Sequence, residues 1–304
     1  MLKPILKYSG GKQKELIKYI KFIPSFDKYY EPFFGGGATF FALAPRQARV
    51  GDVNKNLIGF YKDIVKNFPR TKKELQQLQE LYKSNQLDFK QQMKVADGTI
   101  VHNSNEDLYY SIRDMFNGKC RSQYTYSTLY YFINKTAYAG MIRYNKKGEF
   151  NVPYGRYANF NADLLNSKQY ELLKRAEIAN ESYESSFEKA TSKDFIFLDP
   201  PYDTAFSDYG NEEFTGDFGE EKHRKLAEDF KNLSSPALMI ISSTKLTEEL
   251  YGKYVQGRYN KNYSVNIRNR FKSKAEHMII ANYDIMSLWL ALFCGIINKM
   301  FSFH

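Results

Sequence analysis

The stretch "FIFLDPPYDT", residues 195–204, joins four apolar residues directly to a carboxylate, two prolines and an aromatic ring. The apolar run is typical of a strand buried in a sheet. Because proline has no N–H to donate to a ladder, Pro200 and Pro201 end that strand and fix a rigid turn. On such a turn the Asp199 carboxylate and the Pro200 carbonyl can both point at one ligand group, and Tyr202 adds a flat face. The turn is therefore predicted to bind a planar ligand with two donors, such as a nucleobase with an exocyclic amine.

The composition indicates a globular protein that favours anionic partners. With 304 residues and 43% hydrophobic content, the chain can bury a core. Its 44 Lys and Arg residues against 34 Asp and Glu give a formal charge of +10. This charge favours nucleic acid or an acidic membrane surface as partner. The 16% aromatic content suits base stacking as well as core packing.

The few Cys and His residues predict neither disulfides nor a metal site. Cys120 and Cys294 lie far apart and match no metal-ligand spacing. The four histidines are equally scattered, at His102, His223, His277 and His304. Cysteines without a pairing pattern fit a reducing compartment, and the N-terminal residues contain no apolar run of signal-peptide length. We therefore expect a cytoplasmic protein without a bound metal.

Residues 29–54 have the pattern that opens a parallel α/β sheet. "YYEPFF" is typical of a short strand closed by glycines 35–37, "ATFFALA" of a helix, and "ARVGDVN" (48–54) of a second strand ending near Asp52. The later α/β segments are the strand "DFIFL", the helix "EEKHRKLAEDFKNL", the strand "ALMIISS", the helix "TEELYGKY" and a hairpin from "YSVNIRNRF" and "EHMIIANY". Parallel sheets place ligands at the carboxyl ends of their strands. The glycines, Asp52 and residues 199–202 are therefore expected to meet at one crevice.

A mainly helical module is predicted between these α/β segments. Its first part is polar and amphipathic, rich in Lys and Gln, and is followed by aromatic clusters. It ends at "RYNKKGEFNVPYG" (143–155), where alternating apolar and polar residues flank the positively charged turn of a β-hairpin. We therefore predict an α/β domain from residues 1–56 and 156–283, with an insert at residues 57–155.

The C-terminal residues 284–304 include the apolar run "IMSLWLALFCGII" (285–297). This run is shorter than a helix that spans a bilayer. A helix or strand packed on the body is the first interpretation, and a peripheral membrane anchor or an oligomer contact are the alternatives. The role of this tail stays open, and no obligatory protein partner is predicted.

The glycines and Asp52 by themselves leave more than one class of protein open. Glycines after a first strand let a ligand approach the backbone, and a carboxylate after the second strand can accept hydrogen bonds from ribose hydroxyls. A nucleotide-linked dehydrogenase would use the same geometry, but it leaves the turn at residues 199–202 without a role. A non-enzymatic DNA-binding protein would explain the charge and the hairpin alone. The turn therefore favours an enzyme that modifies a nucleobase.

Five motifs resemble, in order, the DNA adenine-N6 methyltransferases of the Dam type, the alpha group of the D12 class. They are "LKYSGGK" (6–12), "EPFFGGGATF" (31–40), "GDVN" (51–54), "RYNKKGEFNVPYGRY" (143–157) and "DPPY" (199–202). The resemblance runs from about residue 5 to 283. It implies a Rossmann-like sheet that binds S-adenosyl-L-methionine and releases S-adenosyl-L-homocysteine without a metal. It also implies that the α/β domain is catalytic and that the insert recognises DNA.

The resemblance gives single residues roles in cofactor binding and catalysis. It implies a cofactor pocket made of Tyr8, Gly10, Lys12, Phe33, Phe34, Gly35, Asp52 and Asp199, with Asp52 on the ribose. It implies that Asp199, Pro200 and Tyr202 are catalytic. Asp199 and the Pro200 carbonyl would accept both N–H groups of adenine N6 and turn its lone pair towards the methyl group, while Tyr202 stacks on the flipped base. Asp at the first position, rather than Ser or Asn, favours adenine over cytosine and DNA over RNA.

The resemblance also implies contacts with double-stranded DNA. Lys7 and Arg143 correspond to residues that read guanines in GATC, and Tyr138 to an aromatic residue that enters the duplex. Three hairpin residues complete the expected DNA-binding set: Asn145, Lys146 and Lys147.

Two residues depart from the family's pattern in this region. Ala139 stands where the family usually has Asn, and Met141 where it usually has Leu. GATC or a related short site is therefore expected, in the nucleoid of a prokaryote or in a phage-infected cell. An RNA adenine methyltransferase and an inactive or non-enzymatic DNA-binding relative are the alternatives.

Overall fold

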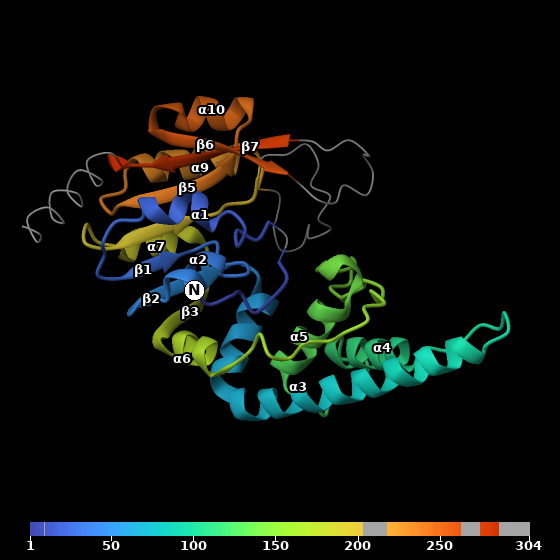
Figure 1. Ribbon diagram of the computed structural model, residues 1–304. Coiled ribbons are helices and arrows are strands. Elements are labelled where there is room, and N and C mark those ends of the chain that lie inside the picture. The colour runs from blue at the N-terminus through green and yellow to red at the C-terminus, as the bar shows by residue number, and fades with distance from the viewer. Residues whose placement is uncertain (9, 203–217, 263–273, 286–304) are drawn as a thin grey trace, which may run out of the picture.

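A seven-stranded sheet forms the centre of the α/β part of the protein (Figure 1). The computed structural model describes residues 1–8, 10–202, 218–262 and 274–285. The strands are β1 (Tyr29–Glu31), β2 (Ala48–Asp52), β3 (Ala176–Asn180), β4 (Phe195–Leu198), β5 (Ala237–Ser242), β6 (Val255–Asn262) and β7 (Lys274–Ala281). Their order is β3-β2-β1-β4-β5-β7-β6. The strands β1 to β5 run parallel to one another, and β7 is antiparallel to both β5 and β6. The order reverses between β1 and β4, which is where sheets of this type bind ligands.

The central strands are apolar on both faces because helices cover both faces. Alternate residues of β4 pack into two separate clusters, with Phe195 and Phe197 on one side and Ile196 and Leu198 on the other. The first side is covered by α1 (Leu16–Tyr19), η1 (Ile20–Phe22), α2 (Ala38–Leu43) and α6 (Ser167–Arg175). The second is covered by α7 (Tyr183–Lys189), α9 (Glu220–Lys231), α10 (Lys245–Tyr251) and η3 (Gly252–Tyr254).

The helices of residues 55–140, which follow β2, extend away from the sheet (Figure 1). They are α3 (Lys55–Val95), α4 (Ser104–Phe116), α5 (Tyr126–Thr136) and the short η2 (Tyr138–Gly140). The helix α3 begins directly after β2 and continues along the whole insert, with non-helical dihedrals at Asn67 and Pro69 just beyond. Proline in a helix interior removes a hydrogen bond and kinks the axis. The kink lies where α3 leaves the sheet and meets α5.

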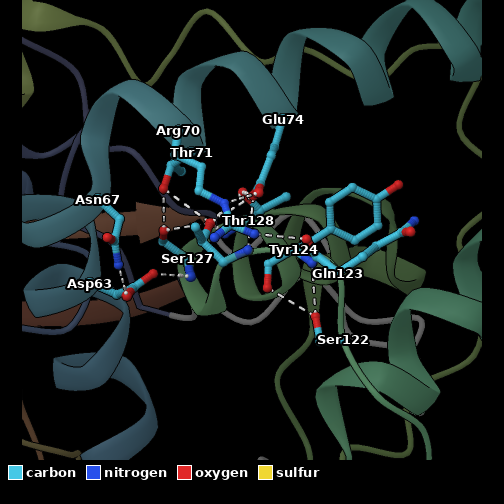
Figure 2. Close-up of polar contacts among 11 residues, drawn as sticks. Asp63, Asn67, Arg70, Thr71, Glu74, Ser122, Gln123, Tyr124, Ser127 and Thr128 are labelled. Atoms are coloured by element: carbon cyan, nitrogen blue, oxygen red, sulfur yellow. Dashed lines mark hydrogen bonds and ion pairs between the residues drawn. The ribbon is translucent and has the colours of Figure 1, made fainter.

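Carboxylates of α3 hold the N-terminus of α5 (Figure 2). Glu74 Oε2 accepts hydrogen bonds from the Thr125 backbone N–H at 2.9 Å and from the Thr128 hydroxyl at 2.7 Å. Asp63 Oδ2 accepts the Ser127 N–H at 2.8 Å. The first N–H groups of a helix have no partner within the helix and carry a partial positive charge, so carboxylates stabilise this end. These contacts fix the direction of α5 and of the residues that follow it.

The structure confirms the α/β fold and corrects two details. The strand β3 (residues 176–180) was not predicted, because its short, half-exposed sequence "AEIAN" has no clear apolar pattern. The strand that pairs with β7 is β6, residues 255–262, which was not predicted, whereas the predicted partner "YSVNIRNRF", residues 263–271, lies outside the described residues. Residues 286–304 of the apolar tail also lie outside them. Within the described part of the chain, no helix has the length and apolar character needed to cross a bilayer.

Candidate active site

The Asp199 carboxylate, at the end of β4, is bound by a buried lysine from the N-terminal segment. Lys12 Nζ lies 2.7 Å from Asp199 Oδ1, and Lys12 is only 2% exposed. The same ammonium donates to the Gly10 carbonyl at 3.2 Å and to the Tyr202 hydroxyl. Lys12 therefore joins the glycine-containing N-terminal turn to both functional side chains of the Asp-Pro-Pro-Tyr turn. Among the described residues, Asp199 Oδ2 accepts no hydrogen bond, so it is available to a ligand.

The protonation of Asp199 depends on this lysine. Burial raises the pKa of the Asp199 carboxyl, and the charge and hydrogen bond of Lys12 oppose that rise. A buried carboxylate without a positive partner would take up a proton and lose its ability to accept two hydrogen bonds. Lys12 is therefore the counter-ion that favours the charged, accepting form of Asp199.

The Tyr8 side chain packs against the glycine turn. A Cβ on Gly35 would lie 2.9 Å from Tyr8 Cε1, and Gly35 has a φ of +47°, so both the contact and the backbone require glycine. Burial raises the pKa of Tyr8, and the charges of Asp52 and Asp199 raise it further. A Cβ on Gly36 would also lie only 3.0 Å from Tyr8 Cβ, so the Tyr8 side chain packs directly on the glycine turn. The structure thus brings these predicted cofactor residues together.

Asp52 holds the glycine turn in place from the end of β2. Its Oδ2 accepts the Gly35 N–H at 2.9 Å and its Oδ1 accepts the Asn54 N–H at 2.9 Å. Each carboxylate oxygen has two lone pairs, so one on each oxygen stays available for a ribose hydroxyl. Burial also raises the pKa of Asp52, while these two N–H donors oppose the rise.

The two phenylalanines of the glycine turn point into different surroundings. The Phe33 ring stacks on Tyr183 with 5.7 Å between centroids and meets the edge of Phe218 at 5.9 Å. Phe34 is 2% exposed and packs 4.8 Å from the Tyr61 ring in the core. The Phe33 side chain can therefore face a ligand, whereas the Phe34 side chain supports the turn from beneath.

A buried charged network beside the turn was not predicted from the sequence. Glu15 Oε1 lies 2.6 Å from Lys261 Nζ, and Glu15 Oε2 lies 3.0 Å from His277 Nδ1 and 2.6 Å from the Tyr259 hydroxyl. The His277 ring meets Tyr202 edge to face at 5.1 Å. Glu15 thus orders the side chain against which Tyr202 packs. The members of this network are dispersed along the chain. The antiparallel pairing of β6 with β7 places Tyr259 opposite His277, and the segment before α1 adds Glu15.

Two of the predicted DNA-binding residues, Tyr138 and Lys7, lie at the turn that follows α5. The Tyr138 side chain is 48% exposed and follows α5 directly. Its turn is completed by Ala139 and Gly140, with φ of +53° and +65°. A Cβ on Gly140 would lie 2.8 Å from Lys7 Cδ, so glycine permits the close approach of Lys7. The turn therefore presents an exposed ring next to a lysine.

The predicted hairpin forms, and its polar residues divide into two groups. Tyr144 pairs with Phe150, and Asn145 Oδ1 accepts the N–H groups of Lys147 and Glu149 inside the turn. Lys146 and Lys147 are exposed at its tip. Arg143 Nε donates to Asn151 Oδ1 at 2.8 Å, which leaves other guanidinium N–H groups available. Asn145 therefore shapes the turn, whereas the two lysines and Arg143 offer charge to a partner.

The relatives of this chain are DNA methyltransferases. The family described as D12 class N6 adenine-specific DNA methyltransferase matches residues 8–267. A Type II methyltransferase, M.CviBI of Paramecium bursaria Chlorella virus NC1A, is 35% identical over 290 residues, which cover 93% of this chain and 100% of that relative. The Type II methyltransferase M.MjaIII of Methanocaldococcus jannaschii is 30% identical, over 84% of this chain and 89% of its own. The DNA adenine methylase of Salmonella typhi is 30% identical, over 81% and 83%.

The chain belongs to the D12 class of N6 adenine-specific DNA methyltransferases. It is therefore an enzyme, a site-specific adenine-N6 methyltransferase whose substrate is DNA, as the five motifs predicted. Methyltransferases in general take the methyl group from S-adenosyl-L-methionine. Two features of this crevice fit that donor: the free lone pairs of Asp52 for ribose hydroxyls, and the partly exposed Phe33 ring for a flat base.

Proposed function

We propose that this chain methylates N6 of an adenine flipped out of duplex DNA, with Asp199, Pro200 and Tyr202 as its catalytic residues. The observation that carries the proposal is the contact of the buried Lys12 ammonium with the Asp199 carboxylate. It joins the motif expected to bind the cofactor to the motif expected to bind the base. A dehydrogenase or a simple DNA-binding protein has no need of this link.

The chemistry proposed for the turn is acceptance of two hydrogen bonds. Asp199 Oδ2 and the Pro200 carbonyl accept the two N–H groups of adenine N6, which pulls the nitrogen towards a tetrahedral geometry and exposes its lone pair. Tyr202, packed against His277, stacks on the extruded ring. When bound, S-adenosyl-L-methionine supplies an electrophilic methyl group. The transfer is proposed to proceed without a metal or a covalent enzyme intermediate.

The cofactor is proposed to bind where the ends of β1 and β2 meet. Asp52 would accept hydrogen bonds from its ribose, and Tyr8 and Phe33 would contact it through their rings. The backbone of Gly10 and Gly35 and the side chain of Lys12 would line the pocket. Phe34 is proposed to act only by supporting the turn, because its side chain lies in the core.

DNA recognition is proposed for residues 57–155, with catalysis in residues 1–56 and 156–283. The exposed Tyr138 would enter the duplex, and Lys7 and Arg143 would read guanines of GATC or a related site. Lys146 and Lys147, at the hairpin tip, would contact the DNA where it faces the hairpin, and Asn145 would stabilise the turn that carries them. Relatives include both Type II methyltransferases and DNA adenine methylases, so a modification or a regulatory role in the cytoplasm is proposed.

Methyl transfer to defined duplexes tests this function. Labelled S-adenosyl-L-methionine is incubated with unmethylated duplexes that carry GATC or its single-base variants. We expect label on adenine N6 of GATC, lost on Asp199→Ala and kept on the exposed control Asp163→Ala. Label confined to another short site would retain the enzyme and overturn GATC. Label on RNA only, or unchanged transfer by Asp199→Ala, would overturn the proposed substrate or the proposed site.

A further inference from the structure

Lys135, in the last turn of α5, is a buried lysine without an acidic partner. Its side chain is 8% exposed. Within the described residues no carboxylate lies within ion-pair distance of its ammonium, and the contact made by that ammonium is with the Tyr131 ring, at 5.2 Å. Lysines are almost never this buried unless they are paired. The position of Lys135 therefore calls for a negatively charged partner that arrives from outside.

Hydrogen bonds to α5 hold a second lysine, Lys7, beside Lys135. The Asn134 side chain accepts the Lys7 N–H at 2.9 Å and donates to the Lys7 carbonyl at 2.7 Å. Lys7 Nζ donates to the Lys135 carbonyl at 3.3 Å and lies 4.0 Å above the Tyr157 ring. These contacts fix the N-terminal motif to the end of α5. They also hold two lysines next to each other, beside the exposed Tyr138 turn.

The electrostatics of the pair are unfavourable in the free protein. Burial, followed by the charge of Lys7, lowers the pKa of Lys135 to about 7, and burial lowers the pKa of Lys7. Among the described residues, Lys7 is the charged group that repels the Lys135 ammonium. Two titratable rings face the lysines: Tyr131 of α5 faces Lys135, and Tyr157 faces Lys7. Burial and the neighbouring charge therefore both favour the neutral form of Lys135 in the free protein.

We propose that Lys135 binds a DNA phosphate next to the base that Lys7 reads, and that it takes up a proton as the phosphate arrives. This inference rests on the proposed function, because it requires duplex DNA at this face. A phosphate is favoured over a base edge because it carries a full negative charge, which offsets the repulsion between two ammonium groups, whereas guanine O6 and N7 carry only partial charges. The proton passes from solvent to Lys135 Nζ.

DNA-binding measurements on Lys135 variants test the inference. Affinities of the full chain for a GATC duplex and a scrambled duplex are measured against salt and pH. For Lys135→Met we expect roughly tenfold weaker binding to both duplexes and a salt slope smaller by about one. Lys7→Met should instead lower the preference for GATC, and the exposed control Lys231→Met on α9 should change neither quantity.

The pH dependence separates proton uptake from simple loss of charge. Native affinity should fall by up to about tenfold per pH unit above pH 7, since the bound form holds the proton more tightly. Lys135→Arg should bind DNA with little pH dependence because its charge is permanent. Thermal unfolding checks that each variant is folded.

Two results would overturn the inference. One is native-like affinity and pH dependence in a folded Lys135→Met variant; the other is a change confined to one base position. If methyl transfer still depends on Asp199 in that case, the proposed function stands alone. If native protein binds no duplex, both proposals fail.

Discussion

Lys12 Nζ lies 2.7 Å from Asp199 Oδ1, and this single contact connects the segment before α1 with the turn after β4. Lys12 also reaches the Gly10 carbonyl and the Tyr202 hydroxyl. The buried ammonium therefore sets both the charge of the proposed catalytic carboxylate and the position of the proposed stacking ring. Breaking a buried ion pair by removing one partner leaves the other charge uncompensated.

Lys12→Met should reduce catalysis and change its pH profile. We expect kcat to fall by about a hundredfold, the scale seen when one group of a preorganised site is removed. Without Lys12 the pKa of Asp199 rises further, because the opposing charge is gone. The acidic limb of the kcat profile should therefore move to higher pH, as the carboxylate is protonated earlier on acidification. An unshifted limb would contradict this role, and the exposed Lys14→Met is the control.

Glu15→Gln should remove stability that depends on pH. Despite its burial, hydrogen bonds from His277, Lys261 and Tyr259 and the charge of Lys12 lower the pKa of Glu15 to about 2. A folded-state pKa below the unfolded value stabilises the protein above about pH 4.5, and this contribution is lost as pH falls towards 2. The shift corresponds to about 3 kcal/mol at neutral pH.

Urea unfolding at pH 7 and pH 3 measures this contribution. The native protein should lose more unfolding free energy between the two pH values than Glu15→Gln does. The exposed Glu228→Gln on α9 is the matched control and should behave as the native protein. Equal losses in all three proteins would show that Glu15 is not the group responsible.

Much of the sheet could be predicted from sequence because its central strands are short, apolar and followed by distinctive turns. "FIFL" before Asp199 and "ALMIIS" in β5 are buried throughout, as their composition indicated. The edge strand β3 lacked that signal because it is half-exposed. A single-sequence pattern reports burial, so an edge strand that mixes polar and apolar residues is hard to distinguish from a loop.

The proposed site divides in the same way. Asp52, Gly35 and Asp199 were predictable because each lies at or just after the carboxyl end of a parallel strand. The partners of Lys12 were not, since a lysine after two glycines gives no sign of burial to 2% exposure. Glu15, His277 and Lys135 were missed for a related reason. Each owes its environment to residues distant in sequence, which only the folded chain brings together.

Glu74→Ala should lower the stability of the protein and its affinity for DNA, with a smaller effect on the rate of methyl transfer. Glu74 Oε2 accepts two hydrogen bonds from Thr125 and one from Thr128, at the start of the helix that leads to Tyr138 (Figure 2). Loss of these acceptors leaves buried donors unsatisfied and should cost about 2 kcal/mol of unfolding free energy. We expect a higher KM for DNA with a smaller change in kcat, because α5 leads to the turn that is proposed to enter the duplex. Unchanged KM in a folded variant would contradict this, and the exposed Glu80→Ala on α3 is the control.

Ala139→Asn should stabilise the turn that presents Tyr138. Ala139 has a φ of +53°, a left-handed conformation that costs a residue with a Cβ roughly 1 kcal/mol, and Asn tolerates it better. Because the side chain is exposed, the substitution needs no repacking. We expect the free energy of unfolding to rise by about 0.5 kcal/mol, and Ala139→Val to lower it, since a β-branched side chain suits this conformation least. The exposed Ala158→Asn lies outside the left-handed region and should give no gain. A gain at position 158 as large as that at 139 would show that the effect comes from asparagine itself rather than from the backbone of this turn.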